Sequence, residues 1–184
     1  MAMILKYHNF PVKGKGTHSY KTSSGLECSF DYGSTTFSWN EMRSQYVGGN
    51  YTTEEANAVA ELMHACGVAV DMEYSPSSSG AYPFKVGQAL IDYFGYDENL
   101  GYVCRQYFTS EEWMNMIKTE LSERRPVLYN GASKDVGHEF VFDGYDSQDM
   151  VHVNWGWGGL NNGYFEVVSL DPSSPGIGLS LIHI

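Results

Sequence analysis

The stretch that decides the fold is Gly137-His-Glu-Phe-Val-Phe-Asp-Gly144 followed by Met150-Val-His-Val-Asn-Trp155, near the end of a 184-residue sequence. Both segments are rich in β-branched and aromatic residues, which favour strands. The intervening Gly144-Tyr-Asp-Ser-Gln-Asp149 has the composition of a turn. The pattern predicts an antiparallel hairpin, and a further strand is expected from Gly163 to Leu170 after a glycine-rich loop.

Helices are expected earlier in the chain. The sequence predicts a helix from a capping box at Thr52-x-x-Glu55 to Gly67, a short strand at Val68–Val70, and helices that begin at Lys85 and Ser110. Residues 12–50 are rich in Gly, Ser, Thr, Tyr and Asn and are expected to form loops and short strands. Because helices come first and antiparallel strands last, we expect an α+β fold and not a doubly wound parallel sheet.

The predicted hairpin has a polar residue on each of its two strands, His138 and Asn154. His138 lies eight residues before Asp146 and Asn154 eight residues after it. A turn centred on Asp146 would therefore place the two side chains opposite each other, with Cβ atoms about 5 Å apart. A histidine oriented by an asparagine is one half of a nucleophilic catalytic site. The alternative is a histidine that only satisfies the end of a strand.

No residue fits the nucleophile on sequence grounds. A catalytic cysteine is activated at a helix N-terminus, whereas Cys66 is expected at a helix C-terminus, Cys104 within a strand and Cys28 in a loop after Glu27. No Gly-x-Ser-x-Gly elbow is present. The three cysteines form no CxxC pair, and His64-Ala-Cys66 has no second pair nearby. We therefore expect small hydrophobic cysteines, no metal and no cofactor.

Composition excludes several classes of protein. The net charge of −11 disfavours binding to nucleic acid or to anionic lipid, because both require clustered Lys and Arg. The sequence contains no apolar run long enough to cross a membrane. Hydrophobic residues reach 42%, which excludes intrinsic disorder and provides enough apolar surface for a core.

The chain resembles the streptopain family of secreted bacterial cysteine peptidases, which have a papain-like fold. The resemblance runs from Met1 to about Gly178. It is carried by Met3-Ile-Leu-Lys-Tyr-His-Asn-Phe-Pro11, Ala60-Glu-Leu-Met63 with Val70-Asp-Met-Glu-Tyr-Ser-Pro-Ser-Ser78, Gly137-His-Glu-Phe-Val-Phe-Asp-Gly144, and His152-Val-Asn-Trp-Gly-Trp-Gly-Gly159.

The resemblance implies roles for particular residues. It makes His138 the general base and Asn154 the orienting residue, and it places Trp155 over that pair. It puts Trp157 on the leaving-group side of the substrate cleft. It also implies an acyl-side cleft, in which Tyr82 and Ala132 depart from the family pattern; the positions expected to line it are Ser78, Gly80, Ala132 and Gly137.

The resemblance further implies a longer parent protein. In the family, the catalytic cysteine lies in a segment just before the piece that matches Met1, and a signal peptide and an inhibitory propeptide precede it. We therefore expect residues 1–178 to be part of a catalytic domain that acts on proteins or peptides outside the cell. Residues 179–184, Leu-Ser-Leu-Ile-His-Ile, are expected to be a non-native tail.

Two other functions are open at this stage. The aromatic, glycine-rich and acidic composition is compatible with a non-catalytic module that binds carbohydrate or protein. A bacteriocin-processing peptidase would share the papain-like fold, but it would pair Gly-His with Asp, where this sequence has Asn154.

Overall fold

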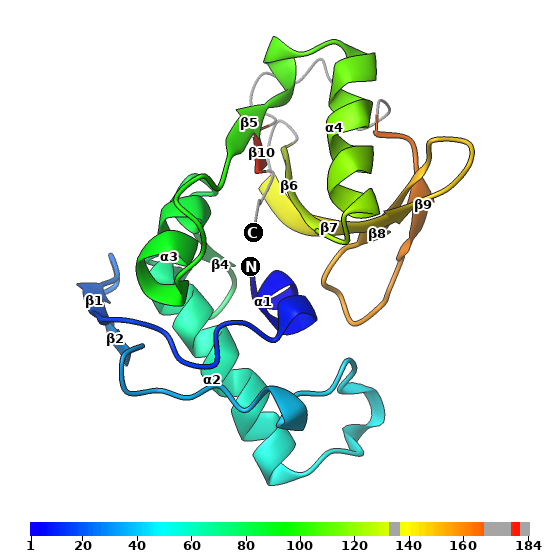
Figure 1. Ribbon diagram of the computed structural model, residues 1–184. Helices are drawn as coiled ribbons and strands as arrows, with labels where there is room; N and C mark the ends of the chain where they lie inside the picture. Colours follow the sequence, from blue (N-terminus) through cyan, green and yellow to red (C-terminus); the bar gives the residue numbers. More distant parts are fainter. Residues whose placement is uncertain (133–136, 168–177, 181–184) are drawn as a thin grey trace. The chain divides into compact units, whose positions relative to one another are not determined.

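The computed structural model describes residues 1–132, 137–167 and 178–180 and divides into two compact units, Met1–Tyr96 and Asp97–Ile184. The first unit is built of helices and short hairpins; its elements are α1 (Ala2–His8), β1 (Thr17–Lys21), β2 (Glu27–Asp31), η1 (Trp39–Glu41), η2 (Val47–Gly49), α2 (Thr53–Ala69), β3 (Glu73–Tyr74), β4 (Ser79–Gly80) and α3 (Lys85–Phe94). Figure 1 colours the chain from blue to red.

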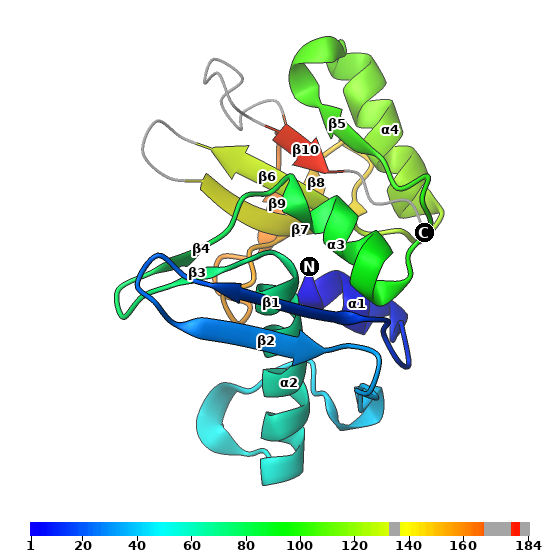
Figure 2. The same cartoon turned by 90° about the vertical axis from the view of Figure 1, so that its left-hand side faces the viewer.

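Helix α2 is the centre of the first unit. The predicted capping box is confirmed, since Thr52 and Glu55 exchange hydrogen bonds between side chain and backbone. Tyr32 is fully buried and donates its hydroxyl to the Ala65 carbonyl at 2.8 Å. Figure 2 shows the antiparallel β1–β2 hairpin beside this helix. The hairpin and α3 therefore pack on a single helical support.

The predicted end of α2 at Gly67 is wrong, and so is the predicted strand at Val68–Val70. The helix continues to Ala69, and the left-handed residue that ends it is Asp71, with φ of 51°. Gly67 serves packing instead, because a Cβ at this position would overlap the hydroxyl of Tyr74. Sequence alone does not distinguish a glycine that ends a helix from a glycine that allows close packing.

Asp71 then connects three elements of this unit. His18 on β1 contacts its Oδ1 at 2.6 Å, and Lys85 on α3 donates to its Oδ2 at 2.7 Å. Burial alone would raise the pKa of Asp71, but the hydrogen bonds from Lys85 and His18 outweigh burial and lower it.

The second unit contains the larger sheet. Its elements are β5 (Tyr102–Cys104), η3 (Arg105–Tyr107), α4 (Ser110–Ser122), β6 (Val127–Ala132), β7 (Gly137–Tyr145), β8 (Val151–Asn154), β9 (Gly163–Phe165) and β10 (Gly178–Ser180). The sheet has the order β5-β10-β6-β7-β8-β9, and its pairs are antiparallel. The larger antiparallel sheet thus follows the helices of the first unit, which is the order predicted for the α+β fold. Residues 178–180 pair with β5 and β6, and residues 181–184 of the expected tail lie outside the described residues.

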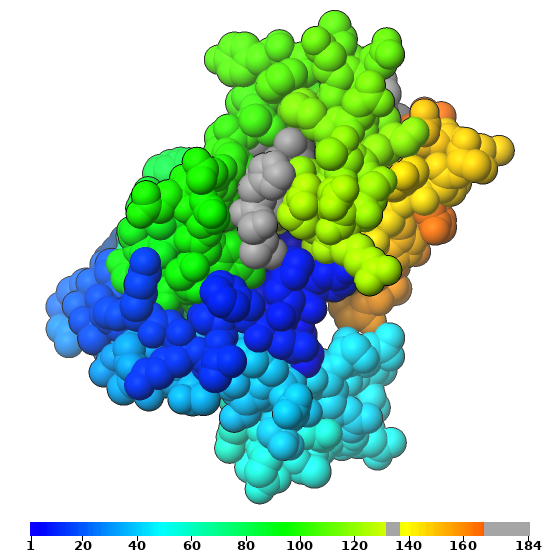
Figure 3. Space-filling view, in the orientation of Figure 1, coloured from blue at the N-terminus to red at the C-terminus, as the bar shows by residue number. Residues whose placement is uncertain are grey.

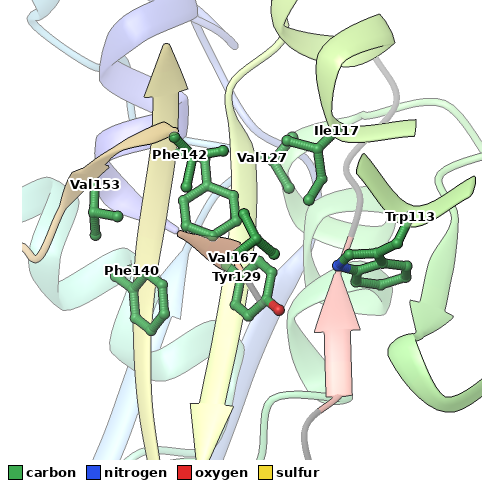
Figure 4. Packing of buried hydrophobic residues seen from close by; sticks show 9 residues of the cluster. Trp113, Ile117, Val127, Tyr129, Phe140, Phe142, Val153 and Val167 are labelled. Atoms are coloured by element: carbon green, nitrogen blue, oxygen red, sulfur yellow. The ribbon is translucent and has the colours of Figure 1, made fainter. Parts of the chain in front are cut away.

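Helix α4 covers one face of this sheet (Figures 1 and 4). Its N-terminus has a capping box between Thr109 and Glu112. The core between helix and sheet combines residues of α4, alternate residues of β6, β7 and β8, and one residue that follows β9; it consists of Trp113, Ile117, Val127, Tyr129, Phe140, Phe142, Val151, Val153 and Val167. In the space-filling view, the outer side chains of α4 form a continuous part of the surface of this unit (Figure 3).

Among the described residues, no helix is both long and apolar enough to cross a membrane.

Candidate active site

His138 is the second residue of β7 and is half-buried among aromatic rings. Its ring centroid lies 4.9 Å from that of Trp157, 6.0 Å from that of Phe140 and 6.3 Å from that of Trp155, with interplanar angles of 22–29°. Gly137 precedes it, and the nearest atom to a Cβ there would be a carbonyl oxygen 4.0 Å away. The imidazole is thus in contact with three aromatic rings, and the glycine that precedes it leaves open space next to it.

A backbone carbonyl fixes the imidazole. His138 Nε2 lies 2.9 Å from the carbonyl oxygen of Trp155. Because a carbonyl can only accept a hydrogen bond, Nε2 must carry the proton. In the neutral ring, Nδ1 is then the nitrogen that can accept a proton.

The predicted opposition of His138 and Asn154 is wrong. Asn154 pairs with Val141, three residues further along β7. The turn is centred later than Asp146, because Tyr145 pairs with Val151, and a β-bulge between Phe142 and Gly144 moves the register back by one residue. An odd net shift exchanges the faces of a strand, so Asn154 lies on the opposite face of the sheet from His138.

Asn154 has a different partner in the structure. Its Oδ1 accepts the N–H of Gly156 at 3.0 Å. That N–H belongs to the same peptide group as the Trp155 carbonyl that binds His138. Asn154 therefore holds the plane of the peptide that contacts the histidine, and its contact with His138 is indirect.

The glycine-rich loop after β8 closes back on Trp155. The backbone N–H of Trp155 donates to Asn162 Oδ1 at 3.1 Å, and its indole Nε1 donates to the Asn161 carbonyl at 3.0 Å. Sequence analysis did not single out Asn161 or Asn162. The available signal was the presence of Gly156, Gly158 and Gly159, since all three have positive φ and let the chain turn back.

His152 forms a pair away from His138. Its Nδ1 lies 2.5 Å from Asp143 Oδ1, and its ring meets Tyr164 edge-on at 5.2 Å. The hairpin turn is capped by Asp146, whose Oδ1 accepts the N–H groups of Gln148 and Met150. Asp143 is the extra residue of the bulge, and its side chain pairs with His152.

Glu139, next to His138 in sequence, points to the other face of the sheet. Burial raises the pKa of Glu139, and the nearby His138 only partly opposes that effect. Its Oε1 is buried and has no hydrogen-bond partner within the described part of the chain. This carboxyl is therefore not an orienting partner of the histidine.

The expected cleft residues belong to both units. Ser78 and Gly80 lie in the β3–β4 hairpin of the first unit, where the Ser78 carbonyl accepts from Ser75. Ala132 pairs with Gly137 in the second unit, and Trp157 is half exposed. Their joint role in a substrate cleft stays a prediction.

The three cysteines are free thiols. Cys28 and Cys66 are buried, as expected for small hydrophobic residues, and burial raises the pKa of Cys66 to about 12. Cys104 ends β5. Across residues 1–132, 137–167 and 178–180, no three His, Cys, Asp or Glu side chains are grouped so that they could hold a metal ion.

Comparison with known proteins places this geometry in context. Streptopain of Streptococcus pyogenes is 38% identical over 185 residues, which cover 96% of this chain and 46% of streptopain. The thiol protease/hemagglutinin PrtT of Porphyromonas gingivalis is 35% identical over 181 residues, covering 97% of this chain and 21% of PrtT. The chain thus spans about half the length of streptopain and less of PrtT.

Solved structures agree. Active interpain A, a cysteine protease of Prevotella intermedia, matches with a TM-score of 0.86 and 40% identity, over 98% of this chain and 76% of interpain A. A fragment of prointerpain A with a cysteine replaced by alanine gives a TM-score of 0.89 at 39% identity, over 99% of this chain and 60% of that one. The predicted papain-like α+β fold is confirmed. The model of the peptidase C10 family matches residues 1–165, so the chain belongs to the peptidase C10 family.

Proposed function

We propose that this chain is part of the catalytic domain of a secreted cysteine endopeptidase, with His138 as its general base. The observation that carries the proposal is the 2.9 Å contact between His138 Nε2 and the Trp155 carbonyl. This contact leaves Nδ1 as the proton acceptor, which is what a base beside a thiol requires. The aromatic wall of Phe140, Trp155 and Trp157 keeps the ring in one orientation.

The nucleophile is proposed to be a cysteine in a segment that precedes Met1 in the whole protein, as the family resemblance implies. Cys66 is a poor candidate, because a thiol with a pKa of about 12 carries almost no thiolate at neutral pH. On this proposal, the 184 residues alone have a base and its support but no nucleophile, so they do not cleave peptides.

The reaction then follows from the proton positions. The thiol proton moves to Nδ1 of His138, and the thiolate attacks the carbonyl carbon of the scissile peptide bond. His138 returns the proton to the leaving amine as the peptide C–N bond breaks and a thioester remains. Water attacks the thioester while His138 accepts its proton; the C–S bond then breaks to release the acid product, and His138 passes that proton to the sulfur, which restores the thiol.

The other roles are proposed from the resemblance together with the structure. Asn154 is a positioning residue that acts through the Gly156 N–H, and Trp155 supplies the carbonyl and shields the ring. The substrate is a protein or peptide, and an N-terminal propeptide blocks the cleft before maturation. The positions proposed to contact substrate are Ser78, Gly80, Ala132, Gly137 and Trp157.

The test is casein hydrolysis by the whole protein that contains this chain, with a thiol-reactive peptide inhibitor as a second readout. His138→Ala should reduce kcat/KM to near background, because the thiol loses its proton acceptor. His152→Ala is the matched control on the same hairpin and should retain activity within a few-fold, since its partner is Asp143. An active His138→Ala, or an equally inactive His152→Ala, would reassign the base. An absence of any thiol-dependent turnover would favour a binding module.

A further inference from the structure

Trp155 is held from both sides by the loop that follows it. Its two flanking peptide groups each have their own anchor: the N–H of Trp155 donates to Asn162 Oδ1 at 3.1 Å, and the N–H of Gly156 donates to Asn154 Oδ1 at 3.0 Å. The indole adds a third anchor on the Asn161 carbonyl, at 3.0 Å. With both planes fixed, the backbone torsions at Trp155 have little freedom.

The fixed carbonyl is the acceptor that binds the imidazole of His138. It accepts from His138 Nε2 at 2.9 Å, so the direction of the Trp155 carbonyl sets which imidazole nitrogen carries the proton and how the ring is turned. A hydrogen bond weakens steeply when its angle departs from linearity. Rotation of the Trp155 peptide group would therefore weaken its hydrogen bond to His138 and let the imidazole turn.

Asn162 is the more remote of the two anchors. It lies seven residues after Trp155, at the end of a loop in which Gly156, Gly158, Gly159 and Asn161 have φ between 60° and 88°. These left-handed residues turn the chain back toward the end of β8, just before β9 begins at Gly163. The loop therefore delivers one side-chain oxygen to one backbone N–H.

We propose that Asn162 is a positioning residue for His138. Through the Trp155 backbone, it keeps the carbonyl aimed at Nε2 and so maintains the imidazole with its proton on Nε2 and Nδ1 free to accept. The proposal rests on the proposed function only in that His138 is the base; the contact geometry is independent of any activity. An acceptor oxygen at position 162 is the chemical requirement, so Asp can replace Asn and an apolar residue cannot.

The experiment reads the His138 tautomer directly. Two-bond proton–nitrogen NMR correlations on the 184-residue chain report the populations of the Nε2–H and Nδ1–H forms. We expect Nε2–H to dominate in the unchanged chain, and Asn162→Ala to reduce the Nε2–H to Nδ1–H ratio by roughly 2- to 10-fold, the effect of losing about one hydrogen bond. Asn162→Asp should restore the original ratio.

The control is Asn161→Gly, which keeps the Asn161 backbone carbonyl and its positive φ and should leave the ratio unchanged. Asn162→Leu is a second variant of similar size without an acceptor. A folded Asn162→Ala or Asn162→Leu with an unchanged ratio would overturn the proposal. Loss of folding in both, with Asn162→Asp folded, would also overturn it, because Asn162 would then be a structural residue only.

Peptidase assays on the whole protein separate this proposal from the proposed function. A tautomer shift in Asn162→Ala, with no thiol-dependent turnover by the unchanged protein, would support the positioning role and refute the peptidase. Turnover that falls in Asn162→Ala and is rescued in Asn162→Asp, with KM nearly unchanged, supports both.

Discussion

The role of Asn154 can be separated from that of His138 by magnitude. Among the residues that the structure describes, the Asn154 side chain makes one hydrogen bond, to the Gly156 N–H at 3.0 Å, and it lies on the opposite sheet face from the imidazole. A typical hydrogen bond contributes about 0.5–1.5 kcal/mol, and a factor of ten in rate corresponds to about 1.4 kcal/mol. Asn154→Ala should therefore reduce kcat/KM by roughly 2- to 12-fold.

The assay is steady-state hydrolysis of a fluorogenic peptide by the whole protein, with folding checked by circular dichroism. Asn154→Asp keeps an acceptor oxygen and should stay within about 2-fold of the unchanged enzyme. The alternative is an Asn154 side chain that contacts the imidazole itself. A loss of 100-fold or more in a folded Asn154→Ala would support that alternative and refute the register argument.

Three further variants test the packing and the charges. Gly67→Ala should destabilise the protein by about 1–3 kcal/mol through overlap with Tyr74, and Tyr74→Leu in the same chain should recover part of the loss in urea unfolding. Asp71 has a lowered pKa, so its ionised form stabilises the fold at neutral pH and that contribution is lost as pH falls below about 4; Asp71→Asn should flatten this acid limb in thermal melts. Glu139 has a raised pKa, so its ionisation destabilises the fold as pH rises; Glu139→Gln should raise the melting temperature at pH 7 and change little near pH 4, and an unchanged melt at pH 7 would contradict the burial argument.

Sequence reasoning succeeded where local chemistry decides the outcome. The capping box at Thr52, the helix from Lys85 to Phe94 and the strand that carries His138 all depend on residues close in sequence. The order of these elements was enough for the α+β class.

It failed where distant residues decide the outcome. The use of Gly67 depends on Tyr74, which reaches it only after the chain has turned at Asp71. The partner of Asn154 depends on a bulge at Asp143, and no sequence pattern located that bulge. A side-chain partner was expected for His138, yet the partner is a backbone carbonyl, a group that every residue carries and no motif can mark.

The two indoles beside His138 also give the protein an internal optical reporter. Of the four tryptophans, Trp155 and Trp157 lie beside the imidazole, while Trp39 and Trp113 are buried in the cores of the two units. A protonated imidazole quenches the fluorescence of an adjacent indole by accepting an electron from its excited state. Trp157, half exposed at 4.9 Å from the ring, should therefore dim when His138 gains its proton. The charge state of the proposed base then becomes visible in a cuvette, without a substrate and without the thiol.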